Sequence, residues 1–141
     1  MKVVVIDGQG GKMGRMIIEQ IKSAEIDCEI MAVGTNSAAT SLMLKAGADQ
    51  GATGENPVIV ACRKADVIIG PIGIVIADAL AGEITPKMAE AVGQSDARKL
   101  LIPVNLCNNV VVGVKQLPMS KLMEEAVEML KALVANGNGK C

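Results

Sequence analysis

The first 21 residues constrain the fold most, because a buried strand, a glycine-rich turn and an amphipathic helix follow one another without a gap. Residues 3–6 are all Val or Ile, a pattern typical of a strand with both faces buried. Glycines stand at positions 8, 10, 11 and 14, and the apolar residues of 16–21 have helical spacing. This order opens a βαβ unit and predicts one doubly wound α/β domain, with a mainly parallel sheet and helices on both faces.

The glycine turn has the chemistry of an anion-binding site. Glycines permit positive φ and close approach of a ligand, and the first N–H groups of the helix attract negative charge. The spacing is GxxGxxG, whereas strict GxGxxG fails because Met13 stands at its third glycine. Binding of a phosphate group is favoured over a tight turn that binds nothing, because the strand and the helix flank the turn as required. The expected cofactor contacts are Gly8, Gln9, Gly10, Gly11, Lys12, Met13 and Gly14. Gly11→Val is then expected to block ligand entry and to leave the fold largely intact.

A second informative place is the end of the next expected strand, at residues 29–34. Dinucleotide-binding units carry an Asp or Glu there, which receives the ribose hydroxyls of the adenosine. This sequence has Thr35, Asn36 and Ser37 instead, and no carboxylate is near in the chain. Small polar groups suit a ribose 2′-phosphate, so NADP is favoured over NAD if either binds. Asn36 or Ser37 serves equally well as the N-cap of the following helix, and the two roles are compatible.

A second glycine turn follows the expected strand 66–70. In an open parallel sheet such a turn lies beside the first glycine turn, where ligands bind. Its glycines either admit a ligand or relieve crowding. The expected contacts here are Gly70, Pro71, Ile72 and Gly73.

Composition excludes several classes of function. The chain has no His, Phe, Tyr or Trp and a net charge of −1, which disfavours His-based catalysis and nucleic-acid binding. The four cysteines lack metal or redox spacing, and no metal site is expected. Catalytic residues stay undefined, because any acid or base would have to come from a few charged residues. These are Asp7, Asp49, Glu55, Glu83 and Lys87.

The same patterns give expectations for the domain, its location and its partners. Residues 1–135 are expected to form one nucleotide-binding domain, followed by a flexible tail at 136–141. No signal peptide or membrane span is recognised, and a cytoplasmic location is expected. A mean hydropathy of +0.40 in a small chain favours a homo-oligomer, alongside a small phosphate-bearing ligand.

Further elements are expected along the chain. Residues 58–65 fit a helix better than a strand, with Asn56 as its cap and Pro57 at its first position. Residues 74–80 are expected to be helical. Residues 99–104 are expected to form a strand that lies near an edge or ends early, because Pro103 cannot donate to a ladder. Asn105 would lie at the carboxyl end of that strand, residues 110–114 would form another strand, and 118–134 an amphipathic helix.

Two resemblances extend these expectations. The run from Gly8 to Arg15 resembles the cofactor loop of dihydrodipicolinate reductases, which wraps the pyrophosphate of NAD(P). It implies cofactor contacts at Gly8, Gly11, Lys12, Met13 and Gly14, but the His-containing catalytic motif of that family has no counterpart here. Over its full length the chain resembles a small bacterial family of uncharacterised Rossmann-like proteins. Its patterns are VIDGQGG, GTN, GATGEN, IIGPIGI, GEITPKMAEA and IPVN.

Three functions remain open at this point. The first is a domain that binds NAD(P) or another phosphate-bearing nucleotide through the glycine turn. The second is a small NAD(P)-dependent oxidoreductase, and the third is a structural or interaction subunit with no nucleotide ligand.

Overall fold

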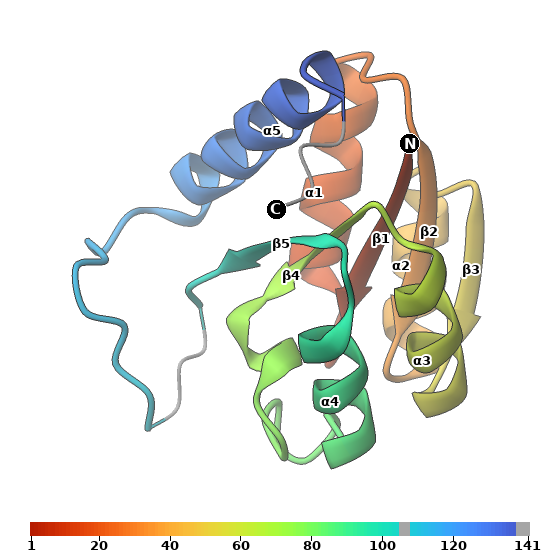
Figure 1. Ribbon diagram of the computed structural model, residues 1–141, viewed down its shortest axis with the longest axis vertical. Coiled ribbons are helices and arrows are strands. Elements are labelled where there is room, and N and C mark those ends of the chain that lie inside the picture. Colours follow the sequence, from red (N-terminus) through yellow and green to blue (C-terminus); the bar gives the residue numbers. More distant parts are fainter. Residues whose placement is uncertain (105–107, 138–141) are drawn as a thin grey trace.

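One five-stranded parallel sheet forms the centre of the protein, in a computed structural model that describes residues 1–104 and 108–137. The spatial order of the strands is β3-β2-β1-β4-β5, with β1 in the middle (Figure 1). Every neighbouring pair is parallel, so all the carboxyl ends lie at one edge. The strands are β1 (Lys2–Asp7), β2 (Glu29–Gly34), β3 (Gln50–Thr53), β4 (Val67–Pro71) and β5 (Arg98–Ile102).

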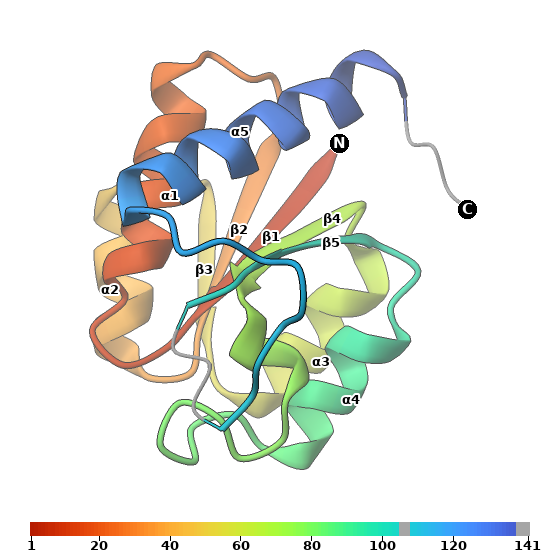
Figure 2. The same cartoon turned by 90° about the vertical axis from the view of Figure 1, so that its left-hand side faces the viewer.

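Helices cover both faces of this sheet, as a doubly wound fold requires. Figure 2 shows α1, α2 and α5 on one side of the sheet and α3 and α4 on the other. The strand order reverses after β3, because the chain then crosses β1 to reach β4. The helices are α1 (Lys12–Ser23), α2 (Ser37–Lys45), α3 (Glu55–Lys64), α4 (Pro86–Gln94) and α5 (Met119–Ala135), with a 3₁₀ turn η1 (Ile72–Val75).

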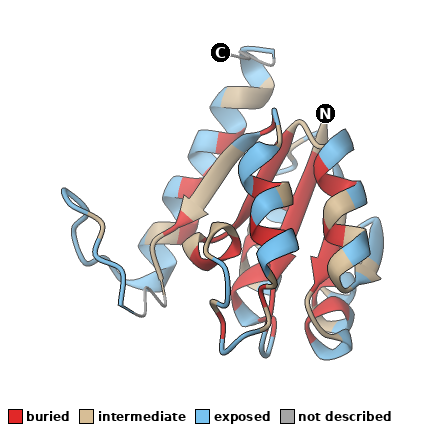
Figure 3. Cartoon of the chain, turned by 60° about the horizontal axis from the view of Figure 1, so that its bottom comes forward, coloured by how far each residue is buried: buried red, intermediate tan, exposed pale blue. Residues whose placement is uncertain are grey.

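The core consists of two aliphatic layers, one on each face of the sheet. Alternate residues of β1 supply them: Val3 and Val5 pack with α1, α2 and α5, whereas Val4 and Ile6 pack with α3 and α4. Figure 3 shows the buried strands in red between helices whose outer faces are exposed. These side chains fix the sheet that holds the loops of its carboxyl edge in place.

Several expected elements and caps are confirmed. Residues 55–64 form a helix, although its N-cap is Gly54 and not Asn56, so Asn56 and Pro57 lie within the first turn. Asn36 caps α2 by accepting a hydrogen bond from the Ala39 N–H at 2.9 Å. Thr85 caps α4, and β5 is an edge strand that ends at Ile102, before Pro103.

Residues 74–80 do not form the expected helix. A 3₁₀ turn ends at Val75, and a series of turns follows with positive φ at Asp78 (66°), Leu80 (55°) and Ala81 (55°). This path places Leu80 and Ile84 in the core beneath α3 and α4, where they are 4% and 0% exposed. Burial of those two side chains therefore outweighs the helical pattern of the local sequence.

Residues 110–114 do not form the expected strand either. A strand needs a neighbour to complete its hydrogen bonds, and no described strand pairs with this segment. Val110 and Val112 are 87% and 93% exposed, on a stretch of chain that projects beyond β5 (Figures 1 and 3). We call residues 108–118 the valine arm.

Two expectations lie outside the described residues. They concern Asn105 and most of the expected tail, since residues 105–107 and 138–141 are not described. No helix within the described ranges is both long enough and apolar enough to cross a membrane.

Candidate functional site

Three loops meet at the carboxyl edge of the sheet and form the candidate site. They are the glycine turn (residues 8–14), the end of β2 at Thr35 and Asn36, and the loop after β4 (residues 72–85). The Thr35 N–H donates to the Asp7 carbonyl at 3.0 Å, and the Asn36 side-chain amide donates to the Gln9 carbonyl at 2.9 Å. The sequence-predicted residues of the first two regions are therefore brought together.

Asp7 closes the glycine turn from the inside. Its carboxylate accepts hydrogen bonds from the Gly8 N–H at 2.8 Å and the Gly14 N–H at 2.7 Å, and the residue is 6% exposed. Burial raises the pKa of Asp7 above its ordinary value and the charge of Glu83 adds to the rise, although the N–H groups act in the opposite direction. Asp7 thus holds the start of α1 against the end of β1 and is not directed at a ligand.

Gly11 and Gly14 are needed for packing within the protein. Gly11 has φ +74°, and a Cβ atom placed there would lie 2.7 Å from the Cα atom of Ala39 in α2. A Cβ atom at Gly14 would collide with the Met43 sulfur and lie 3.0 Å from the Asp7 Cβ atom. The expectation that Gly11→Val leaves the fold intact is therefore wrong, because the valine would strike the backbone of α2.

The outer side of the same turn is open. A Cβ atom at Gly10 would meet no heavy atom within 4 Å, and Gly10 and Lys12 are both exposed. Within the described ranges, neither the Gly10 N–H nor the Lys12 N–H has a protein partner. No side chain caps α1, and its first turn contains no acidic residue. Two N–H groups and the positive end of the helix dipole therefore face solvent here.

Glu83 brings a carboxylate to the point where the glycine turn meets the end of β2. It accepts hydrogen bonds from Thr35 Oγ1 and Asn36 Nδ2, both at 2.7 Å, and from the Gln9 N–H at 3.1 Å. Burial raises the pKa of Glu83, but the hydrogen bonds from Asn36, Thr35 and Gln9 together outweigh it and hold the pKa below its usual value. Glu83 is therefore an anionic acceptor that is half-buried at the edge of the site.

This position of Glu83 removes the basis of the expected preference for NADP. That preference assumed that no carboxylate lies near Thr35, whereas the Glu83 Oε1 atom is 2.7 Å from Thr35 Oγ1. Both ends of the Asn36 side chain are already bonded, and Ser37 is exposed at the start of α2. Glu83 is among the possible acids and bases expected from the sequence, but the sequence carries no signal that it reaches Thr35, 48 residues away.

The second glycine turn is shaped mainly by contacts within the protein. A Cβ atom at Gly70 would lie 2.5 Å from the Ile6 carbonyl oxygen, so this glycine lets β4 approach β1. A Cβ atom at Gly73 would lie 3.2 Å from the Ala79 Cβ atom, within the loop after β4. Pro71 is buried at the end of β4, and Ile72 is half-buried. Ligand contacts at these four residues stay a prediction.

The other candidate acids and bases lie elsewhere. Asp49 lies at the opposite edge of the sheet, where its carboxylate accepts a hydrogen bond from the Ile30 N–H at 2.7 Å and forms an ion pair with Lys22. Glu55 begins α3, and Lys87 is exposed on α4. In the part of the chain that the structure describes, no group of three or more Cys, Asp and Glu side chains is arranged to hold a metal ion.

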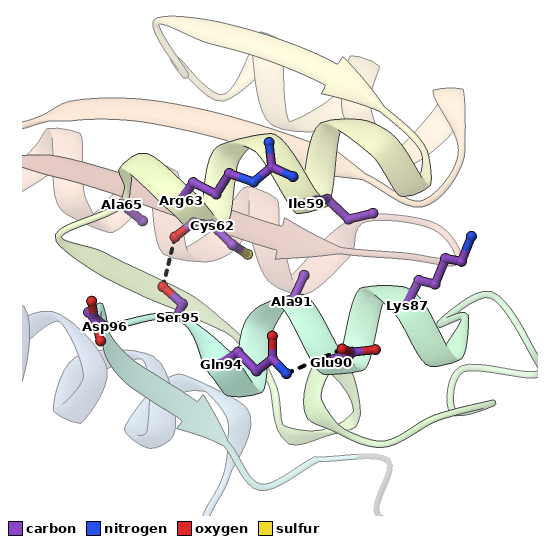
Figure 4. A pocket seen from close by; sticks show the side chains of 10 residues that line it. All are labelled: Ile59, Cys62, Arg63, Ala65, Lys87, Glu90, Ala91, Gln94, Ser95 and Asp96. Carbon is purple, nitrogen blue, oxygen red and sulfur yellow. Dashed lines mark hydrogen bonds between the residues drawn. The ribbon is translucent and has the colours of Figure 1, made fainter.

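A separate groove of about 600 Å³ runs between α3 and α4 (Figure 4). Its polar side chains already have partners or face solvent: Ser95 donates to the Cys62 carbonyl at 2.7 Å, and Gln94 donates to Glu90 at 3.2 Å. Burial raises the pKa of the Cys62 thiol to about 11, which keeps it protonated and unreactive near neutral pH. The groove is a gap between two helices without a convergent set of unpaired polar groups.

The chain was compared with curated proteins, solved structures and protein families. No curated protein matches the chain. One solved structure to which the chain has a weak likeness is a dodecameric FMN-dependent Ubix-like decarboxylase from Escherichia coli O157:H7, with 18% identity and a TM-score of 0.45. That match covers 94% of this chain and 76% of the other chain. A family model described as "Domain of unknown function (DUF3842)" matches residues 2–135. Because this match spans nearly the whole chain, the chain belongs to the DUF3842 family.

Proposed function

We propose that this protein binds a nucleotide through a phosphate group held at the outer side of the glycine turn. The observation that carries the proposal is the pair of N–H groups at Gly10 and Lys12, which have no partner among residues 1–104 and 108–137. They stand at the start of a 12-residue helix with no acid in its first turn. Backbone N–H groups and the helix dipole together stabilise a phosphate group.

The side chain of Lys12 adds a positive charge to this end of α1. Arg15, one turn further along, is engaged with Glu19 at 3.3 Å, whereas Lys12 makes no ion pair with any described residue. A nucleotide diphosphate, as in NAD, matches this arrangement of N–H donors and one cation. The expected ligand contacts at Gly8–Gly14, Thr35–Ser37 and Gly70–Gly73 belong to this proposal.

The test is a thermal-shift screen of the purified protein against NAD, NADP, FAD, ATP, GTP and coenzyme A. A ligand that binds only the native state raises the unfolding midpoint, and at 100 times its Kd it adds about 2.7 kcal/mol of stability. Gly10→Glu is expected to abolish the shift, because it places bulk and negative charge beside the two N–H groups.

Gly93→Glu is the matched control for this variant. Gly93 lies on α4, and a Cβ atom there also meets no heavy atom within 4 Å. The control is expected to fold and to keep the ligand shift. Absence of a shift for the wild-type protein with all six nucleotides would overturn the proposal.

A second proposal concerns self-association, and the valine arm favours it. Val110 and Val112 are 87% and 93% exposed, next to β5, whose outer edge pairs with no described strand. Exposed apolar side chains beside a free sheet edge favour contact with another chain. Light scattering is expected to give the mass of an oligomer, and Val112→Lys is expected to lower that mass. Val60→Lys, at an exposed position of α3, is the control that leaves the mass unchanged.

A further inference from the structure

Glu83 lies between the glycine turn and the residues that follow β2. In open parallel sheets the adenosine ribose lies between the glycine turn and the end of the next strand, and a carboxylate there accepts from the ribose hydroxyls. The Glu83 carboxylate touches both boundaries of that space: the Gln9 N–H on the turn at 3.1 Å, and Thr35 and Asn36 at the end of β2 at 2.7 Å. Here the carboxylate comes from the loop after β4 and not from β2 itself.

The two oxygens of this carboxylate are unequally occupied. Oε1 accepts from Thr35, Asn36 and Gln9, whereas Oε2 accepts from the Gln9 N–H at 3.1 Å and from no other described residue. A carboxylate oxygen has room for about two donors. Oε2 is therefore able to accept a hydrogen bond from a hydroxyl group, and the residue is partly exposed to solvent.

The chain segment that follows β2 lacks a cation that would neutralise an added phosphate. Residues 34–44 contain no Lys or Arg, and the next cation along the chain is Lys45 at the far end of α2. A phosphate group on the ribose 2′ position would thus lie against the Glu83 charge without a compensating cation from this segment. Like charges in such proximity repel each other, whereas a neutral hydroxyl donates a hydrogen bond.

The loop holds Glu83 firmly in this position. Leu80 and Ile84 on either side of it are buried in the core. The Ile84 N–H donates to the Ala79 carbonyl at 3.1 Å, and the Asp78 N–H donates back to the Ile84 carbonyl at 2.7 Å. These contacts fix the backbone at residue 83, so the carboxylate is placed before any ligand arrives.

We infer that Glu83 determines the specificity of the site: it selects nucleotides with a free ribose 2′-hydroxyl and rejects those with a 2′-phosphate. This inference rests on the proposed nucleotide site and adds the class of ligand that the site accepts. It also reverses the preference for NADP expected from residues 35–37.

The test is titration calorimetry with NAD and NADP, which differ only in the 2′-phosphate. The wild-type protein is expected to bind NAD at least tenfold more tightly than NADP. Glu83→Gln removes the charge at nearly constant shape, so it is expected to weaken NAD binding and to reduce the ratio below threefold. Glu90→Gln is the matched control, because Glu90 is an exposed glutamate on α4, away from the turn. It is expected to leave the ratio unchanged.

The outcomes separate this inference from the proposed function. Binding of NADP as tightly as NAD by the wild-type protein overturns the inference and leaves the nucleotide site standing. If a folded Glu83→Gln protein keeps the wild-type ratio of NAD to NADP affinity, the inference is likewise overturned and the nucleotide site still stands. If the variant does not fold, the wild-type ratio and a comparison of ADP with 2′-deoxy-ADP decide, with weaker binding of the deoxy form expected. Absence of binding of all these nucleotides overturns both proposals.

Discussion

The inner and outer sides of the glycine turn differ in what they contact. On the inner side Gly11 and Gly14 pack against α2, and the N–H groups of Gly8, Gly11 and Gly14 donate to acceptors within the protein. On the outer side Gly10 and Lys12 are exposed, and the N–H of the neighbouring Gln9 donates to Glu83. One short run of glycines thus performs two tasks, close packing of a helix on one side and an open row of donors on the other. A glycine motif alone does not tell which glycine serves which task.

The largest expected effect comes from placing a side chain on the inner side. Gly11→Val is expected to lower the free energy of unfolding by about 4 kcal/mol, since a β-branched residue at positive φ adds strain to the collision with Ala39. Urea denaturation measures this loss. Gly10→Val is the control on the outer side, with an expected change of less than about 1 kcal/mol. Equal losses in the two variants would abolish the distinction between the sides.

The anchor of the loop that carries Glu83 gives the next largest effect. Ile84→Ala leaves a cavity at a side chain that is 0% exposed, and is expected to cost about 3 kcal/mol of stability. Ile84 adjoins Glu83, so the hydrogen bonds from Thr35 and Asn36 are expected to weaken as well. Denaturation of this variant beside Val60→Ala, at a position that is 38% exposed, measures the difference. A loss no greater than that of the control would mean that the loop is not anchored through Ile84.

Replacement of the inner carboxylate has a smaller expected effect. Asp7→Asn keeps one acceptor oxygen and turns an NH₂ group toward the second N–H group, at an expected cost of about 2 kcal/mol. Chemical denaturation at neutral pH gives this value. Asp78→Asn, an exposed residue with positive φ that Asn tolerates, removes the same charge as a control. Comparable stability of the two variants would show that Asp7 does not hold the turn.

The smallest effect is a pH dependence that distinguishes the two carboxylates. The pKa of Glu83 lies below its ordinary value of 4.5, so its contribution to stability is present above that value and is lost as the pH falls through the lowered pKa. The pKa of Asp7 is raised from 3.8, so its contribution to stability has the opposite pH dependence. That contribution is present at low pH and is lost as the pH rises through the raised pKa. The difference in unfolding free energy between wild type and Glu83→Gln is expected to shrink as the pH falls below 4.5. The difference between wild type and Asp7→Asn is expected to change with pH in the opposite direction. Parallel pH profiles for all three proteins would contradict these assignments.

The sequence predicts the architecture well because the fold is encoded in local patterns. The apolar run of β1, the glycines after it and the helical spacing of α1 are adjacent in the chain, and Asn36 and Thr85 mark helix starts by their own chemistry. Pro103 likewise predicts an edge strand. Each of these signals acts over a few residues, where propensity and packing agree.

The sequence predicts the candidate site only in part, because the position of Glu83 and the packing of α2 depend on contacts between distant residues. Glu83 reaches Thr35 through a loop in which Leu80 and Ala81 have positive φ. These residue types rarely adopt that conformation, so the sequence does not predict the loop. The spacing of Gly8, Gly11 and Gly14 also could not show that α2 lies against the inner side. The β-branched run at residues 110–114 favours a strand, but propensity cannot supply a neighbouring strand.

The hydrogen bond from Gln9 to Glu83 makes one amide proton a reporter of loop position. Gln9 is exposed, and an exposed amide normally exchanges its hydrogen with water quickly, yet this one is held by a carboxylate 74 residues away. Its exchange rate in an NMR spectrum would therefore measure how often the loop after β4 leaves the turn. The same signal would respond to a nucleotide without any label, in a protein whose lack of aromatic residues leaves no intrinsic fluorescence to follow.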